Sequence, residues 1–168
     1  DFLDLASNSG SRVTTLTSGD KIIYDETVPT LPTVDISSNN SNGATFAKVG
    51  DVITISVSAS ENIQTPTVTI AGNAAVIATG SNGERVYTAT YTMQSSDNTG
   101  VIPFTVDFSD MANNAGTQVT AVANDSDGGV TFDKQAPSFT TVTMSSDNST
   151  STLAIVNDVI TINLTSDE

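Results

Sequence analysis

The sequence repeats itself along its length, and this repeat constrains the fold more than any other feature. The stretch DETVPTLPTV begins at Asp25, and a close copy, DKQAPSFTTV, begins 108 residues later at Asp133. AKVGDVITISVSASE (47–61) returns as AIVNDVITINLTSDE (154–168), with DVITI unchanged. The opening DFLDLASNSG is repeated as DFSDMANNAG (107–116). Self-similarity at a fixed period is typical of structural units that follow one another along a chain.

These repeats divide the chain into one complete unit and two partial ones. Residues 1–24 are predicted to be the C-terminal part of a preceding repeat, and residues 133–168 the N-terminal part of a following one. Residues 25–132 are predicted to be a complete repeat. Segments as short as the two flanks cannot build a hydrophobic core alone. We expect them to be completed by further sequence, by another molecule or by packing against the middle repeat.

Strands are the elements that the hydrophobic pattern predicts. In DVITISVSA and ERVYTATYTM, apolar residues alternate with polar ones, as they do in half-buried strands. The valine and threonine in these runs suit a pleated surface. Turn-forming clusters such as SSNNSNG and SSDNTG separate the runs, and no segment has a helical period. Seven strands are predicted, at 31–37, 51–59, 65–71, 74–79, 84–93, 101–108 and 116–122.

About seven short strands in one repeat, separated by frequent turns, predict an all-β fold. The expected architecture is an antiparallel β-sandwich of two sheets. The chain contains no cysteine, histidine or tryptophan, so neither a disulfide nor a Cys/His metal site can form. A thiol nucleophile and an imidazole proton shuttle are excluded for the same reason. Val, Ile, Phe and Ala must therefore hold the sheets together.

The charge of the chain limits its partners. There are 19 acidic and 5 basic residues, which give a formal net charge of -14. Nucleic acid and anionic membrane surfaces would be repelled. The sequence has no apolar run of about 18 residues, so we expect no membrane insertion. The partners that fit this charge are cations, uncharged glycans, proteins and the neighbouring repeats of the same chain.

The order of the motifs resembles that of a known family. D-x-x-x-P is followed by GDVITISVSASE, then by YTATYTM and DFSDMANNAG, and this order is similar to that in bacterial Ig-like repeats of large surface adhesins. The resemblance covers all 168 residues. It implies an Ig-like sandwich in a tandem array, on the bacterial cell surface or secreted. The chain departs from the family at SDMANN, where an AGN triplet is usual, so the resemblance does not imply the geometry of this loop.

The function that the resemblance implies is mechanical. Each repeat would be one bead of a structural extender, or stalk, that supports cell adhesion and biofilm formation, and calcium would stiffen the junctions. Two alternatives remain open at this point. The repeat can itself be a glycan-binding or protein-binding module, or the chain can be a subunit of a self-assembling extracellular filament whose partial ends pair between molecules.

The sandwich topology predicts where acidic residues meet. In a seven-strand sandwich, the N-terminus and the loops after the second and sixth strands lie at the same end. Asp25, Glu61, Asp107 and Asp110 occupy these places. Calcium takes 6–8 oxygen ligands, for which carboxylates are well suited. Grouping like charges without a cation costs roughly 1 to 4 kcal/mol for each close pair, and a bound ion would reverse that cost.

The repeats extend this set of acidic residues. Asp133 and Glu168 correspond to Asp25 and Glu61, and Asp1 and Asp4 correspond to Asp107 and Asp110. The alternative is that these are solvated loop residues or turn caps, a common role of aspartate. The candidate metal ligands are Asp25, Glu61, Asp107, Asp110, Asp133 and Glu168.

Two other acidic stretches are weaker candidates for a metal site. NDSDGG (124–129) alternates acids as calcium loops do, but it lacks the closing glutamate, which favours an Asp-Gly turn. SSDNTG (95–100) is interpreted as a turn at the opposite end of the sandwich.

Paired carboxylates can cleave glycosides. However, the chain has no tryptophan platform, and only 5% of its residues are aromatic. We therefore expect that the protein is not an enzyme.

Overall fold

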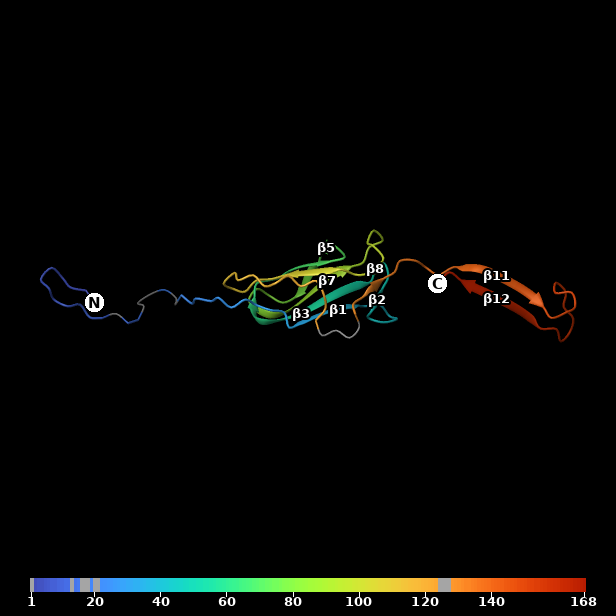
Figure 1. The fold of residues 1–168 in the computed structure, drawn as a ribbon, viewed down its shortest axis with the longest axis horizontal. Helices are drawn as coiled ribbons and strands as arrows, with labels where there is room; N and C mark the ends of the chain where they lie inside the picture. The colour runs from blue at the N-terminus through green and yellow to red at the C-terminus, as the bar shows by residue number, and fades with distance from the viewer. Residues whose placement is uncertain (1, 13, 16–18, 20–21, 124–127) are drawn as a thin grey trace.

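The computed structural model describes residues 2–12, 14, 15, 19, 22–123 and 128–168 (Figure 1). The described residues form strands and loops and no helix. None of them belongs to a helix long and apolar enough to cross a membrane. The strands are β1 (Thr33–Ser38), β2 (Phe46–Ala47), β3 (Val52–Ile63), β4 (Thr67–Ile70), β5 (Asn73–Ala74), β6 (Val76–Thr79), β7 (Glu84–Thr92), β8 (Gly100–Val101), β9 (Phe104–Asp107), β10 (Thr131–Phe132), β11 (Phe139–Ser146) and β12 (Ile160–Ser166).

The middle of the chain is a β-sandwich, as predicted. One sheet has the order β1-β3-β7-β6, and the other has the order β5-β4-β9. All neighbours in these two sheets are antiparallel. A small third sheet, β2-β10-β8, closes one end and contains the parallel pair β2 and β10. The prediction of an all-β sandwich is therefore confirmed.

The core lies between the two main sheets. Alternate residues of β3 and β7 point inward, as the period-two pattern predicts, and the facing residues of β4 and β9 complete the core. Every buried apolar side chain among the described residues lies between Pro29 and Phe132. The largest fully buried side chains include Tyr87, Phe132, Ile53, Ile55, Ile63 and Ile70. The two flanks add nothing to this core.

Two predicted strands are each divided in the structure. Of the segment 74–79, Ala74 belongs to β5, which pairs with β4, and Val76–Thr79 form β6, which pairs with β7 in the other sheet. The chain therefore changes sheets within this short run. The segment 101–108 forms β8 and β9 with Pro103 between them. Proline has no N–H to donate to a ladder, which explains the break.

The last predicted strand, 116–122, does not form. Its residues make only isolated bridges, between Val119 and Val106 and, just beyond the range, between Ala123 and Val34. Val106 belongs to one sheet and Val34 to the other, so the chain crosses between sheets here instead of extending either one. Conversely, the short strands β2 and β10 were not predicted, because two residues are too few to show alternation.

The hairpin β11–β12 has the same register as the pair β1–β3. Ile36 faces Ile55 in the sandwich, and Met144 faces Ile162 in the hairpin. The inward side chains of β1 and β3 are buried, whereas the corresponding apolar side chains of the hairpin are at least 49% exposed. Figure 1 shows the hairpin and the N-terminal segment extending from opposite ends of the sandwich. The division into repeats stays a prediction, but the hairpin has the geometry of an uncovered β1–β3 pair.

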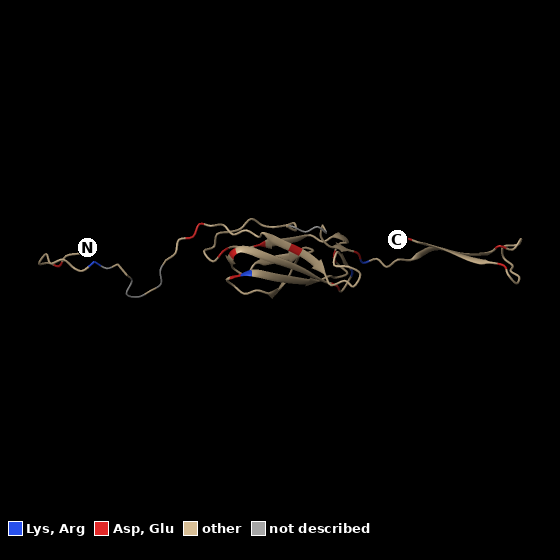
Figure 2. Ribbon diagram, turned by 90° about the horizontal axis from the view of Figure 1, so that it is seen from below, with Lys and Arg blue, Asp and Glu red and all other residues tan. Residues whose placement is uncertain are grey.

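Acidic side chains are distributed along the whole molecule. Figure 2 shows Asp and Glu on both flanks and at both ends of the sandwich, with few Lys and Arg among them. Lys48 and Asp51 form the only salt bridge among the described residues, at 2.6 Å. Most carboxylates are therefore stabilised by solvent or by hydrogen bonds. Where several carboxylates lie close together in the described part of the chain, neither lysine nor arginine compensates their mutual repulsion.

Candidate metal centre

Three carboxylates meet at the end of the sandwich where the chain first joins it. One carboxylate oxygen from each of Asp25, Glu61 and Asp110 lies within 4.8 Å of the other two. Asp110 is buried, and the other two residues are half-buried. Asp25 precedes the sandwich, Glu61 lies near the end of β3, and Asp110 lies in the loop after β9. We call these three residues the acidic triad.

Asp110 is held by its own loop. Its Oδ1 accepts hydrogen bonds from the backbone N–H groups of Ala112 and Asn114, both at 2.8 Å. Its Oδ2 accepts one from Asn114 Nδ2 at 2.7 Å. A carboxylate has about four lone-pair sites. Three of them are used in these bonds, which leaves one on Oδ2 for a further donor or a cation.

Asp110 is ionised at neutral pH. Burial by itself would raise the pKa of its carboxyl, but the hydrogen bonds from Asn114 and Ala112 outweigh burial and hold the pKa below its ordinary value. The group therefore carries its negative charge beside two other carboxylates. A cation placed among the three would be attracted by all of them.

The end of β3 positions Glu61 against this loop. The ladder between β3 and β7 is irregular between Ser58 and Ile63, a place where a strand can redirect its side chains. Ile63 then forms a bridge with Asp110. Glu61 was expected after the end of its strand, but β3 runs on to Ile63, so Glu61 lies within it. The extension of β3 is what brings Glu61 beside Asp110.

Asn114 connects the loop to the residues that precede the sandwich. Its Nδ2 donates to the backbone oxygen of Asp25 at 3.2 Å as well as to Asp110. Gln64 braces the same loop, because its Nε2 donates to the Asp110 carbonyl and to Asn113 Oδ1, both at 2.8 Å. Neither of these two positioning residues is among the predicted metal ligands. The repeat of Asp-x-Ala-x-Asn could have indicated Asn114, whereas Gln64 has no comparable signal.

Asp107 is not part of the acidic triad. It is the last residue of β9, where it alternates with the buried residues Val106 and Phe108 and is exposed. Its Oδ1 accepts a hydrogen bond from Gln118 Nε2 at 2.8 Å. Because successive side chains of a strand point to opposite faces, Asp107 points away from the core side of β9.

The predicted ligands of the following unit are both exposed. Asp133 Oδ1 accepts a hydrogen bond from Gln135 N at 2.9 Å, just as Asp25 Oδ1 accepts one from Thr27 N at 3.0 Å. Glu168 is exposed at the end of β12. Among the described residues, neither Asp133 nor Glu168 belongs to a group of three or more carboxylates that could hold a metal ion. Asp1 and the acidic part of the stretch 124–129 lie outside the described residues.

The loop around Asp110 is reproduced near the N-terminus. Asp4 Oδ1 accepts hydrogen bonds from the backbone N–H groups of Ala6 and Asn8, and its Oδ2 accepts one from Asn8 Nδ2, all at 2.9 Å. An aromatic ring covers a glycine in both loops, Phe2 over Gly10 and Phe108 over Gly116, where a Cβ would lie 2.2 Å from a ring atom. The same loop forms without a sandwich around it. Turn capping is therefore a local role of this aspartate, separate from any metal.

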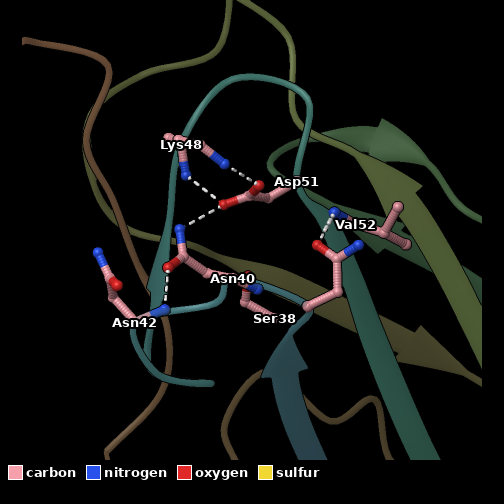
Figure 3. Close-up of polar contacts among 7 residues, drawn as sticks. Ser38, Asn40, Asn42, Lys48, Asp51 and Val52 are labelled. Atoms are coloured by element: carbon pink, nitrogen blue, oxygen red, sulfur yellow. Dashed lines mark hydrogen bonds and ion pairs between the residues drawn. The ribbon is translucent and has the colours of Figure 1, made fainter.

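A second buried carboxylate organises the opposite end of the sandwich. Figure 3 shows Lys48 and Asn40 pointing at Asp51. Asp51 accepts hydrogen bonds from Lys48 Nζ and Asn40 Nδ2, both at 2.6 Å, and from Lys48 N at 2.9 Å. In the hairpin, Asp158 accepts the equivalent bonds from Asn148 Nδ2 and Ile155 N, both at 2.8 Å. We interpret Asp51 as a loop organiser, because its bonds are all internal.

We expect the sandwich to lose stability in acid as Asp51 is protonated. The side chain of Lys48 lowers the pKa of Asp51 below 3.8, its ordinary value. The unfolded chain therefore takes up the proton first, so this stabilisation is complete above pH of about 4 and is lost as the pH falls through the folded pKa. Asp51→Asn should weaken the sandwich by about 1 to 3 kcal/mol at pH 6 and by less at pH 3.

Urea unfolding followed by circular dichroism at pH 6, 4 and 3 measures this effect. The exposed Asp35 provides the control, because Asp35→Asn changes the same residue type without removing an internal contact. Equal losses for Asp51→Asn at all three pH values would contradict the assignment.

Comparisons of this chain with protein-family models, with curated proteins and with solved structures found no match. The chemistry of the site therefore rests on its own residues. Three carboxylates with no histidine or cysteine can hold a metal ion through oxygen ligands alone.

Proposed function

We propose that this chain is a segment of a structural extender, built from Ig-like sandwiches in tandem, which serves as an extracellular stalk in a bacterial surface adhesin. We further propose that the acidic triad binds calcium and stiffens the junction where each unit begins. One observation carries the proposal: Asp25, which precedes the sandwich, lies against Glu61 and Asp110 of the sandwich itself. An ion held by all three would fix the incoming chain to the unit.

The position of the two ends of the sandwich supports a stalk. The incoming chain is bonded to the loop at Asn114, and the outgoing chain is bonded at the opposite end, where Asp133 N donates to the Ala47 carbonyl at 2.9 Å. Figure 1 shows the chain arriving at one end of the sandwich and leaving from the other. Units joined in this way extend along a line, which is the geometry that a spacer needs.

The choice of calcium follows from the ligands. Oxygen donors favour hard cations, and calcium accepts irregular sets of six to eight oxygens. The acidic triad supplies three carboxylates, and the backbone oxygens nearby and water are the expected source of the rest. Magnesium requires a stricter octahedron and dehydrates reluctantly, so it should bind this half-buried site less well.

Calcium should stabilise and straighten the protein. At a calcium concentration of about one hundred times the Kd, binding adds about 2.7 kcal/mol to the free energy of unfolding. For a domain of this size, that corresponds to a rise in Tm of about 10 °C or more. Differential scanning calorimetry and small-angle X-ray scattering, in calcium and then in chelator, measure the Tm and the maximum dimension.

Magnesium at the same concentration is the matched control and should raise the Tm by less. If neither the Tm nor the maximum dimension responds to calcium, the calcium-stiffened junction is wrong.

A second candidate function is a self-assembling filament, which the uncovered face of β11–β12 favours. Val142, Met144 and Ile162 on this hairpin are 62%, 73% and 59% exposed. Patches of this kind often bind another protein surface. Analytical ultracentrifugation separates the two functions, because a filament subunit associates as its concentration rises, whereas a stalk segment stays monomeric.

A further inference from the structure

The loop that joins β7 to β8 meets the residues that leave the sandwich. Lys134 Nζ donates hydrogen bonds to two backbone oxygens of this loop, to Ser95 O at 3.1 Å and to Asp97 O at 2.9 Å. Two carbonyl oxygens that converge on one ammonium group form a small cation receptor. We propose that this loop is a docking surface for the unit that follows, and that the ammonium group of Lys134 is its ligand.

The receptor loop is held firmly from inside. Asp97 is only 7% exposed, and its Oδ2 accepts a hydrogen bond from Gln94 N at 2.8 Å. Its Oδ1 accepts hydrogen bonds from the Tyr91 hydroxyl at 3.2 Å and from Asn73 Nδ2 at 3.3 Å. The side chain of Asp97 thus organises the loop, while its carbonyl oxygen stays available to Lys134. A loop braced in this way loses little freedom when it binds a ligand.

The backbone that carries Lys134 is also anchored. Phe132 in β10 is 1% exposed, and the N–H of Asp133 donates to the Ala47 carbonyl at 2.9 Å. Lys134 therefore lies one residue beyond a backbone that is anchored in the sandwich. The segment from Gln135 to Ser138 then leads to β11. We call the pair of hydrogen bonds from Lys134 to Ser95 O and Asp97 O the clamp. The clamp sets the direction in which the following unit leaves the sandwich.

The equivalent position in the middle repeat has the opposite charge. Glu26 aligns with Lys134, and its carboxylate accepts a hydrogen bond from the Tyr24 hydroxyl at 3.0 Å. A carboxylate cannot donate to carbonyl oxygens, so this clamp cannot form at Glu26. Junctions in the same chain therefore differ in stiffness according to the residue at this one position. The chain has only five basic residues, and one of them is placed here.

The clamp is separate from the acidic triad. Asp133 corresponds to Asp25, so, if the proposed calcium function holds, its carboxylate serves the following unit. Lys134 binds the preceding unit instead. Consecutive residues then hold the junction from both sides. The lysine contact itself needs no metal, which allows the two proposals to be tested apart.

The test uses Lys134→Met in the full 168-residue chain, measured in chelator. NMR ¹⁵N relaxation reports the order of residues 134–137, and amide exchange reports the bond between Asp133 N and Ala47 O. In the original protein these residues should be ordered like the sandwich. Methionine keeps a flexible apolar stem like that of lysine but removes the ammonium group, so these residues should become mobile and the Asp133 amide should exchange about tenfold faster.

Three further variants sharpen the result. Lys134→Arg should restore much of the order, because a guanidinium also donates to carbonyl oxygens. Lys134→Glu should be at least as mobile as Lys134→Met. Arg85→Met is the control, because it removes a basic side chain that bonds Asn62 and contacts neither the receptor loop nor the residues that leave the sandwich, so residues 134–137 should stay ordered. If Lys134→Met and the original protein show the same relaxation and exchange, the docking surface is overturned. A missing calcium effect would leave these measurements unchanged.

Discussion

Replacing Ile53 with alanine should lower the free energy of unfolding by about 2 to 5 kcal/mol, whereas the same change at Ile160 should alter it by about 0.5 kcal/mol or less. The two residues hold the same place in the register, opposite Ser38 in β1 and opposite Ser146 in β11. Ile53 is completely buried between two sheets, so alanine leaves a cavity there. Ile160 is 49% exposed on a hairpin that no second sheet covers.

Urea unfolding followed by circular dichroism measures both variants. A comparison within one chain is sharper than a single core substitution, because the residue type, the strand and the cross-strand partner are all matched. Equal losses at the two sites would show that the hairpin face is covered in solution. In that case the dependence of stability on protein concentration would identify a second molecule as the cover and would favour the filament over the stalk.

Glu61→Gln should weaken calcium binding by about tenfold or more, because it removes one of three charges that surround the ion. Asp110→Asn should weaken binding similarly, but it also disturbs the loop, because the amide Nδ2 cannot accept the bond from Asn114. Among the described residues, none donates a hydrogen bond to the Glu61 side chain. Glu61→Gln is therefore the cleaner test of the metal site.

Asp107→Asn is the matched control for these two variants. Asp107 was predicted with the other ligands, but it bonds Gln118 outside the acidic triad. Isothermal titration calorimetry should find its calcium affinity within about twofold of the original protein. Unchanged calcium binding by Glu61→Gln would remove the acidic triad as the site. A loss of binding in Asp107→Asn would show instead that the ion is bound elsewhere, beside the end of β9.

Strands with long, regular alternation were predictable, and those shaped by distant contacts were not. DVITISVSA and ERVYTATYTM correspond to most of β3 and β7, since each has one face that must be buried. The segment 116–122 has a similar composition but forms no strand, because its residues bond first to Val106 in one sheet and then to Val34 in the other. Local propensity contains no information about such a crossing.

The candidate site, too, was predictable only in part. Loop positions alone placed Asp25, Glu61 and Asp110 at one end, and the structure brings these three together. Asp107 was grouped with them, although its alternation with Val106 and Phe108 indicates an outward side chain. Gln64 could not have been predicted, because its contact with the Asp110 loop depends on how far β3 extends.

Features that depend on neighbours along the chain follow from the amino-acid order alone: the repeat, the alternating faces of β3 and β7, and the Asp-x-Ala-x-Asn turn, which forms at both Asp4 and Asp110. Which distant groups meet depends on the folded arrangement of the strands. Asp25 reaches Asp110 because Asn114 bonds both, and Lys134 reaches Asp97 because β10 is anchored beside β2 and β8. Local patterns fix the direction of a side chain relative to its own strand, whereas the partners of that side chain depend on how separate strands pair.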